Sequence, residues 1–146
     1  MAIYNSSGKE LKANYIVLYG TNEVNITSGN FSNYQEVPFS TVKNSYGDNF
    51  ELSNYKVSVN TACTVEISGA VNTSLANDMF QVKVMKNSEE LLIVDHPIST
   101  NMASIVIPSI ITEVSAGDTI YLIMSYNNTN THIVRLHRSR LVVKEI

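Results

Sequence analysis

Apolar and polar residues alternate along the middle of the chain. The apolar members of this pattern are Tyr55, Val57 and Val59, followed after a polar break by Cys63, Val65 and Ile67. Successive side chains of a β-strand point to opposite faces, so a period of two predicts strands with one face in a core. We therefore predict two strands that meet near Asn60.

The same period continues in the second half of the chain. It is carried by Phe80, Val82 and Val84, and again by Ile120, Leu122 and Met124. Residues 86–90 are polar and lead into a second apolar run at 91–94, which predicts a hairpin. No segment has an apolar face at helical spacing. The pattern predicts an all-β protein, a β-sandwich or barrel of about eight to ten antiparallel strands.

A length of 146 residues fits one domain. The strand pattern is less regular before residue 35, although the run at 15–20 fits an edge strand. We therefore expect residues 1–34 to form an N-terminal arm or attachment segment and residues 35–146 to form the sandwich domain.

Seven short motifs follow one another from residue 37 to the C-terminus, over roughly three-quarters of the chain. They are Val37-Pro-Phe39, Asn44-Ser-Tyr-Gly47, Tyr55-Lys-Val-Ser-Val59, Val65-Glu-Ile-Ser-Gly69, Met85-Lys-Asn-Ser88, Val114-Ser-Ala-Gly-Asp118 and Arg140-Leu-Val-Val143. Their order and spacing resemble the jelly roll shared by tumour necrosis factor (TNF) and the globular head of complement component 1q. The resemblance implies a jelly-roll β-sandwich and a homotrimer built around a three-fold axis. It carries over no ligand site.

Within that group, the chain looks most like jelly-roll modules of tailed bacteriophages and bacterial surface proteins. Its surface is polar but weakly charged, because only 16% of residues are charged, and the chain is rich in Asn, Ser and Thr. Cys63 is the single cysteine, which excludes an intrachain disulfide. The first twenty residues lack the pattern of a signal peptide. We therefore expect a protein made in the host cytoplasm and displayed on the virion.

The charge and the hydropathy pattern exclude two classes of partner. A net charge of −3 gives no general attraction to nucleic acid. No apolar run approaches the roughly 18 residues of a membrane span. We expect neither nucleic acid nor a membrane as a partner.

The sequence offers no catalytic or metal-ligating set, and we expect no cofactor. Cys63 lies on the predicted core side of its strand, where a free cysteine is usually a small buried apolar residue. The three histidines, His96, His132 and His137, do not have the spacing of a metal site. Asp118 follows Gly117 directly before a strand, which predicts a turn rather than an acid catalyst.

All three arginines of the chain lie close together near its C-terminus. They are Arg135, Arg138 and Arg140, with His137 among them. On one continuous strand, Arg135 and His137 share one face, and Arg138 and Arg140 share the other. Two interpretations stay open: ion pairs with acidic residues of neighbouring strands or of the next subunit, and an anion site for a phosphate- or carboxylate-bearing saccharide.

Tyr121 and Ile123 alternate with core residues of their strand, so they point away from the sandwich interior. A strand that is apolar on both faces is covered on both. We therefore predict that Tyr121 and Ile123 contact a neighbouring subunit.

Three functions follow from these observations. The first is a non-enzymatic virion protein, a trimeric head-fibre, decoration or tail-tip module attached to other virion proteins through its N-terminal segment. The second is a receptor-binding module that recognises a host-surface saccharide. The third is a small β-sandwich enzyme that acts on glycans, although no convincing pair of carboxylates supports it.

Overall fold

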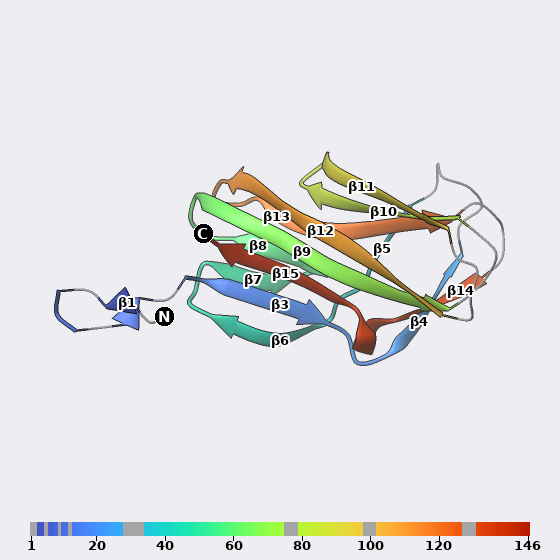
Figure 1. The fold of residues 1–146 in the computed structure, drawn as a ribbon, viewed down its shortest axis with the longest axis horizontal. Coiled ribbons are helices and arrows are strands. Elements are labelled where there is room, and N and C mark those ends of the chain that lie inside the picture. Colours follow the sequence, from blue (N-terminus) through green and yellow to red (C-terminus); the bar gives the residue numbers. More distant parts are fainter. Residues whose placement is uncertain are drawn as a thin grey trace.

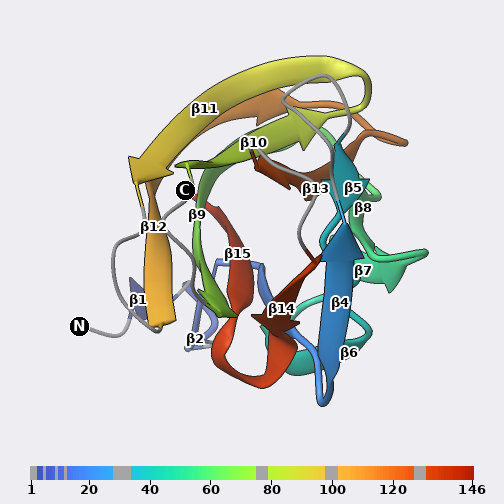
Figure 2. The ribbon, with the colours of Figure 1, turned by 90° about the vertical axis from the view of Figure 1, so that its right-hand side faces the viewer.

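The computed structural model describes residues 3–4, 6–8, 10–11, 13–27, 34–74, 79–97, 102–126 and 131–146. These residues form two antiparallel sheets that pack face to face, together with a separate two-stranded pair, β1 (Ile3–Tyr4) and β2 (Glu10–Leu11). Figure 1 shows the sandwich along its length, and Figure 2 shows it end on. The arrangement confirms the predicted all-β sandwich.

One sheet has six strands in the order β11-β10-β13-β8-β7, with β5 paired to β13. Its strands are β5 (Gln35–Glu36), β7 (Phe50–Ser53), β8 (Lys56–Val59), β10 (Met79–Lys86), β11 (Glu89–Pro97) and β13 (Thr119–Tyr126). The predicted hairpin is confirmed, since β10 and β11 pair across a turn at Asn87 and Ser88.

The other sheet has seven strands in the order β4-β14-β9-β15-β3-β6, with β12 paired to β9. Its strands are β3 (Tyr15–Tyr19), β4 (Glu23–Thr27), β6 (Thr41–Tyr46), β9 (Cys63–Ser74), β12 (Met102–Val114), β14 (Thr131–Arg135) and β15 (Arg140–Glu145). The two sheets hold more strands than the predicted eight to ten because several edge segments are short and the C-terminal strand is interrupted.

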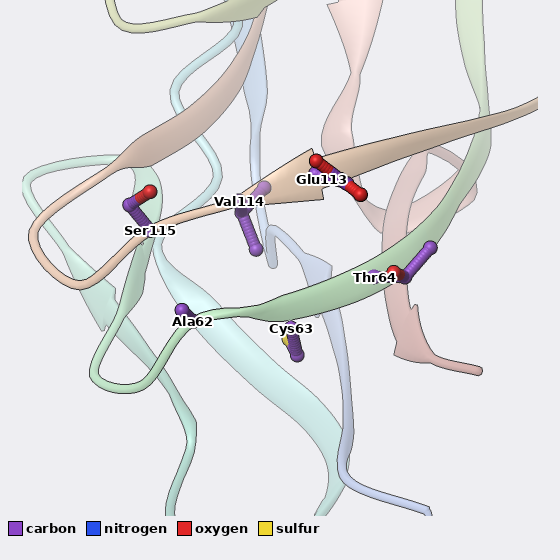
Figure 3. Close-up of a pocket in the computed structure, with 6 residues that line it drawn as sticks. All are labelled: Ala62, Cys63, Thr64, Glu113, Val114 and Ser115. Carbon is purple, nitrogen blue, oxygen red and sulfur yellow. The ribbon is translucent and has the colours of Figure 1, made fainter.

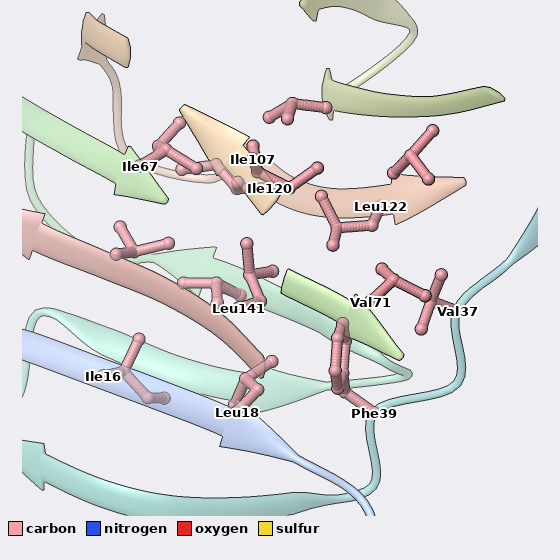
Figure 4. Packing of buried hydrophobic residues seen from close by; sticks show 14 of the residues in the cluster. Ile16, Leu18, Val37, Phe39, Ile67, Val71, Ile107, Ile120, Leu122 and Leu141 are labelled. Atoms are coloured by element: carbon pink, nitrogen blue, oxygen red, sulfur yellow. The ribbon is translucent and has the colours of Figure 1, made fainter. Parts of the chain in front are cut away.

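The core lies between the sheets and is made by the alternating apolar residues. Ile16, Leu18 and Leu141 enter it from the seven-stranded sheet, and Ile120 and Leu122 enter it from the six-stranded sheet (Figure 4). The connection between β5 and β6 adds two more fully buried side chains, Val37 and Phe39. The first of the seven motifs therefore contributes to the core without being a strand.

The alternation identified the buried residues of β8 and β9 but placed one start wrongly. Val57, Val59, Val65 and Ile67 are buried as predicted. Tyr55 is 43% exposed instead, because it lies in the turn before β8 with φ of +67°. Tyr55, which we predicted as the first residue of this strand, thus belongs to the preceding turn.

The predicted N-terminal arm contains strands of the sandwich. We predicted an edge strand at 15–20, but β3 lies inside the seven-stranded sheet, between β15 and β6. Strand β4 pairs with β14. Residues 1–2, 5, 9, 12 and 28–33 of the predicted arm lie outside the described residues. An attachment role for residues 1–34 stays a prediction.

None of the described residues forms a helix long and apolar enough to cross a membrane.

Candidate binding surfaces

We predicted that the three arginines lie on one strand, and this prediction is wrong. Strand β14 ends at Arg135, a 3-10 turn follows at Leu136–Arg138, and β15 begins at Arg140. Both strands pair with the same neighbour, β9, in the registers Val134↔Thr73 and Arg140↔Ala70. From Val134 to Arg140 the chain advances by six residues, while β9 advances by only three, from Thr73 to Ala70. Three extra residues therefore leave the sheet. We call residues 135–140 the arginine bulge.

Hydrogen bonds and a buried side chain of its own residues fix the bulge against the sheet. Leu136 is buried, and its carbonyl accepts hydrogen bonds from the backbone N–H groups of Gly20 and Ser139, each at 3.1 Å. A Cβ at Gly20 would lie 2.4 Å from the Leu136 Cβ, so only glycine leaves room for this side chain. The Ser139 hydroxyl donates to the Arg135 carbonyl at 2.8 Å and accepts from the Asn72 N–H at 2.9 Å. The bulge is therefore an ordered feature of the sheet.

The arginines of the bulge differ in their partners. Arg135 pairs with Glu23 of the adjacent strand, with 3.3 Å between Nε and Oε1, and keeps 20% of its side chain exposed. His137, Arg138 and Arg140 are exposed. No acidic residue in the described part of the chain pairs with Arg138 or Arg140. Among the described residues, ion pairing thus accounts for Arg135 alone.

The face of the seven-stranded sheet that points away from the core mixes apolar and polar residues, and sequence reasoning missed its apolar part. Cross-strand registers arrange it in three rows: Tyr46, Tyr15, Lys144, Glu66 and Ile111; Asn44, Val17, Val142 and Ser68; and Arg140, Ala70 and Val106. We call these residues the exposed face. Val106 and Ile111 are each 65% exposed. Large exposed apolar patches on a protein often mark interaction sites.

Val106 and Ile111 lie on an unpaired edge of the sandwich. Strand β12 pairs with β9 along one side, and on its other side it lies next to β11, the end strand of the six-stranded sheet (Figure 2). Ile93 of β11 is also exposed, at 40%. The run at 105–111 is apolar on both strand faces, and this was the signal in the sequence that could have revealed the patch.

Tyr121 and Ile123 lie on the outward face of the six-stranded sheet, as expected from their alternation. The Tyr121 hydroxyl donates to the Asn87 carbonyl at 2.7 Å, and the Lys56 ammonium lies 4.8 Å from the centre of its ring. Ile123 stands between Lys83 and Glu36 of the adjacent strands. Tyr121 thus has partners within its own chain, and a subunit contact at these two residues stays a prediction.

A pocket of about 340 Å³ lies at the end of the sandwich where β9 begins and β12 ends (Figure 3). It is lined by Ala62, Cys63, Thr64, Glu113, Val114 and Ser115. Cys63 and Glu113 point to opposite sides of the sheet, which follows from the registers Val114↔Cys63 and Glu113↔Thr64. The pocket therefore does not pair its thiol with its carboxylate.

The Cys63 thiol packs against the core at its edge. Burial raises the pKa of Cys63, and the Glu145 carboxylate raises it further, while a hydrogen bond from the Asn49 amide at 3.3 Å acts in the opposite direction. A raised pKa leaves less thiolate, the form that acts as a nucleophile. Within the described part of the chain, no group of His, Cys, Asp or Glu is arranged to hold a metal ion.

Asp118 forms the predicted turn. Its carboxylate accepts hydrogen bonds from the Ser115 backbone N–H at 2.8 Å and from the Asn87 side chain at 2.9 Å, and Gly117 has φ of +89°. Asn87 lies at the tip of the β10–β11 hairpin with φ of +54°. Asp118 thus joins two turns that are far apart in the sequence.

The hydrogen bonds from Asn87 and from Ser115 hold the pKa of Asp118 below its ordinary value of 3.8. A carboxyl group whose pKa is lowered by folding contributes its full stabilisation at pH values above its ordinary pKa. This contribution is lost as the pH falls through the lowered pKa. We therefore expect Asp118→Asn to be less stable than the wild type at pH 7, with the difference shrinking below about pH 4. Urea unfolding at several pH values measures it, and Glu51→Gln is the control. A difference that stays constant with pH contradicts the ionic role.

Comparison with known proteins confirms the jelly roll. A crystal structure of murine APRIL at pH 8.5 matches with a TM-score of 0.70 and 17% identity, over 92% of this chain and 100% of that chain. Eiger TNF from S. frugiperda matches with a TM-score of 0.71 and 12% identity, over 92% of each chain. Pika GITRL matches with a TM-score of 0.54 and 16% identity, over 92% of this chain and 97% of that chain. No family model and no curated protein matches the sequence. The chain therefore has a TNF-like jelly-roll fold.

Proposed function

We propose that the chain is a non-catalytic binding module that assembles with further copies of itself into a trimer. The exposed face carries this proposal. In a single chain it leaves Val17, Val142, Val106 and Ile111 at least partly in contact with water. Burial of apolar surface is worth about 25 cal/mol per Å², so covering such a face favours association.

A second copy of the chain is the occupant that fits this face. The face carries both signs of charge, with Lys144 opposite Glu66, and Glu113 follows on the same side of β12. The exposed edge at Val106 and Ile111 is a different patch from the half-buried surface at Val17 and Val142. A contact between two different patches is heterologous, and such contacts form a closed ring when the rotation between subunits closes and an open filament when it does not. Three subunits are proposed because TNF-like jelly rolls typically form trimers.

The mass of the full chain in solution tests the assembly. Size-exclusion chromatography with light scattering at micromolar concentration is expected to give three times the mass of the monomer. A stable monomer would contradict the proposal, and a dimer would contradict the three-fold ring.

We further propose display on a bacteriophage particle, as a head-fibre, decoration or tail-tip module. Support comes from the sequence: an Asn-rich, weakly charged surface, one cysteine and the resemblance to phage modules. Because β3 and β4 belong to the sheet, we assign the attachment to residues 1–12, which precede β3 in the sequence. A chain lacking residues 1–12 is expected to stay trimeric but to be lost from purified particles, as measured by mass spectrometry. If the full chain and the shortened chain are retained equally on the particles, attachment through this segment is contradicted.

Recognition of a host-surface saccharide is the second candidate function. The observation that favours it is the exposure of Arg138 and Arg140 without carboxylate partners in the described chain. The same two residues suit an ion pair with a neighbouring subunit, so the ligand and the assembly need separate measurements.

A further inference from the structure

The arginine bulge lies beside a residue that sequence reasoning did not single out. Extending the register Val134↔Thr73 by one residue places Arg135 next to Asn72. Thr73 and Val71 are buried, so Asn72 points to the other side of the sheet, the side of Arg140 and the exposed face. On its far side Asn72 pairs with Ser104 of β12, an exposed residue. Arg135, Asn72 and Ser104 thus form a row at the end of the exposed face.

Two polar atoms in this row have no partner among the described residues. They are the Nη1 of Arg135, a donor, and the Oδ1 of Asn72, an acceptor, and both atoms are buried. A buried polar atom that stays without a partner destabilises the fold. Both atoms are covered in the single chain, so a ligand reaches them when the side chains of Arg135 and Asn72 turn outward, and it then supplies an acceptor to the guanidinium and a hydroxyl to the amide.

The charges around this row define the kind of ligand. Arg138 and Arg140 flank Ser139, whose hydroxyl binds the Asn72 backbone. Glu23 offsets one of the three arginines. The local surface is therefore positive although the chain as a whole carries −3. Guanidinium groups bind phosphate and carboxylate through paired hydrogen bonds.

We propose that the arginine bulge, with Asn72 and Ser104, is a binding site for an acidic saccharide. The phosphate or carboxylate of the sugar accepts hydrogen bonds from Arg135, Arg138 and Arg140. A neighbouring sugar hydroxyl donates to Asn72. A free phosphate ion satisfies the arginines but has no sugar hydroxyl for the amide, so it binds more weakly. The inference rests on the proposed role as a binding module and names its ligand class.

Titration of the full chain with three probes tests the site. Glucose 6-phosphate, inorganic phosphate and glucose are compared by calorimetry or by the shifts of the arginine Nε–H signals in NMR. Saturable binding is expected to be strongest for glucose 6-phosphate, weaker for inorganic phosphate and undetectable for glucose. Binding of glucose with equal affinity, or equal binding of both phosphates, contradicts the proposal.

Two variants assign the contacts. Arg138→Ala with Arg140→Ala is expected to weaken glucose 6-phosphate binding at least tenfold. Asn72→Ala is expected to lower it to the level of inorganic phosphate while leaving inorganic phosphate binding unchanged. The matched control, Lys43→Ala with Lys86→Ala, removes the same charge elsewhere and is expected to change binding less than twofold. An equal loss in this control means a general charge effect and overturns the site.

The assembly is measured on the same samples. All residues of the site come from one chain, so binding is expected even if the wild type proves to be a monomer. A double arginine variant that falls apart while keeping its affinity for glucose 6-phosphate assigns Arg138 and Arg140 to the subunit contact and overturns the proposal. The failure of the trimer and the failure of the site are thus distinguishable.

Discussion

Replacing Val106 and Ile111 together with glutamate is expected to convert the trimer into monomers at micromolar concentration. In one chain both side chains are 65% exposed, so the change costs the monomer little. In the assembly they would be covered by a neighbouring copy, and an unpaired carboxylate buried in such a contact costs several kcal/mol. Because 1.4 kcal/mol is a factor of ten, association is expected to weaken about 100-fold or more. Light scattering across a concentration series measures the change.

A second variant separates the two candidate interfaces. Ile123→Glu introduces one carboxylate on the outward face of the other sheet, where the sequence predicted the subunit contact. If the trimer forms through the exposed face, Ile123→Glu stays trimeric while the Val106 and Ile111 variant does not. The opposite result places the contact at Tyr121 and Ile123. Circular dichroism confirms that each variant is folded, which is expected because all three positions are partly or largely exposed.

The alternation of apolar and polar residues predicted the central strands because one face of each strand contacts the core and the other points outward. Val65 and Ile67 lie against the core, and Glu66 between them points outward. The pattern was weaker where a strand begins, since it depends on side chains and not on the backbone. Tyr55 has the apolar character of a core residue, but the chain bends at Asn54 and Tyr55, which both have positive φ.

The arginine bulge left a trace in the sequence that a single strand cannot explain. The apolar residues Val134 and Leu136 occupy even positions, while Leu141 and Val143 occupy odd ones. All four are buried, so the alternation changes phase between them. A phase change requires an odd number of extra residues, which matches the three that leave the sheet. Interpreting residues 132–141 as one regular strand therefore placed Arg140 on the face of Val134 and Leu136, whereas it lies on the opposite face, beside Ala70.

The run at 105–111 could have indicated an apolar outward patch on β12, but the full exposed face could not be predicted from any one segment. Val17, Val142 and Val106 lie on β3, β15 and β12, and only the pairing of distant strands places them on the same side of one sheet. Each of the three segments is apolar at successive positions, which indicates burial on both faces but not the identity of the neighbours. Asn72 was missed for the same reason, because its significance comes from Arg135, which is far away in sequence.

Gly69, the last residue of the fourth motif, shows how one strand accommodates irregular neighbours on both sides. On one side, the register of β12 shifts between Ile107, which faces Gly69, and Ile110. On the other side, β15 begins at Arg140, the last residue of the bulge. A Cβ at Gly69 would lie 2.4 Å from the Arg140 carbonyl oxygen. Glycine inside a strand often marks such a close approach of another backbone.

Gly69→Ala is therefore expected to destabilise the fold by about 3 kcal/mol, the upper part of the range for overpacked cores. The clash is with backbone, which cannot move aside as the end of a side chain does. Urea unfolding followed by circular dichroism measures the loss, with Ser68→Ala as a control that is expected to change stability by about 0.5 kcal/mol or less. An unfolding midpoint equal to that of the wild type would mean that β9 and β15 lie further apart at this point. Because the displaced atom belongs to Arg140, the folded variant is also expected to bind glucose 6-phosphate more weakly than Ser68→Ala does.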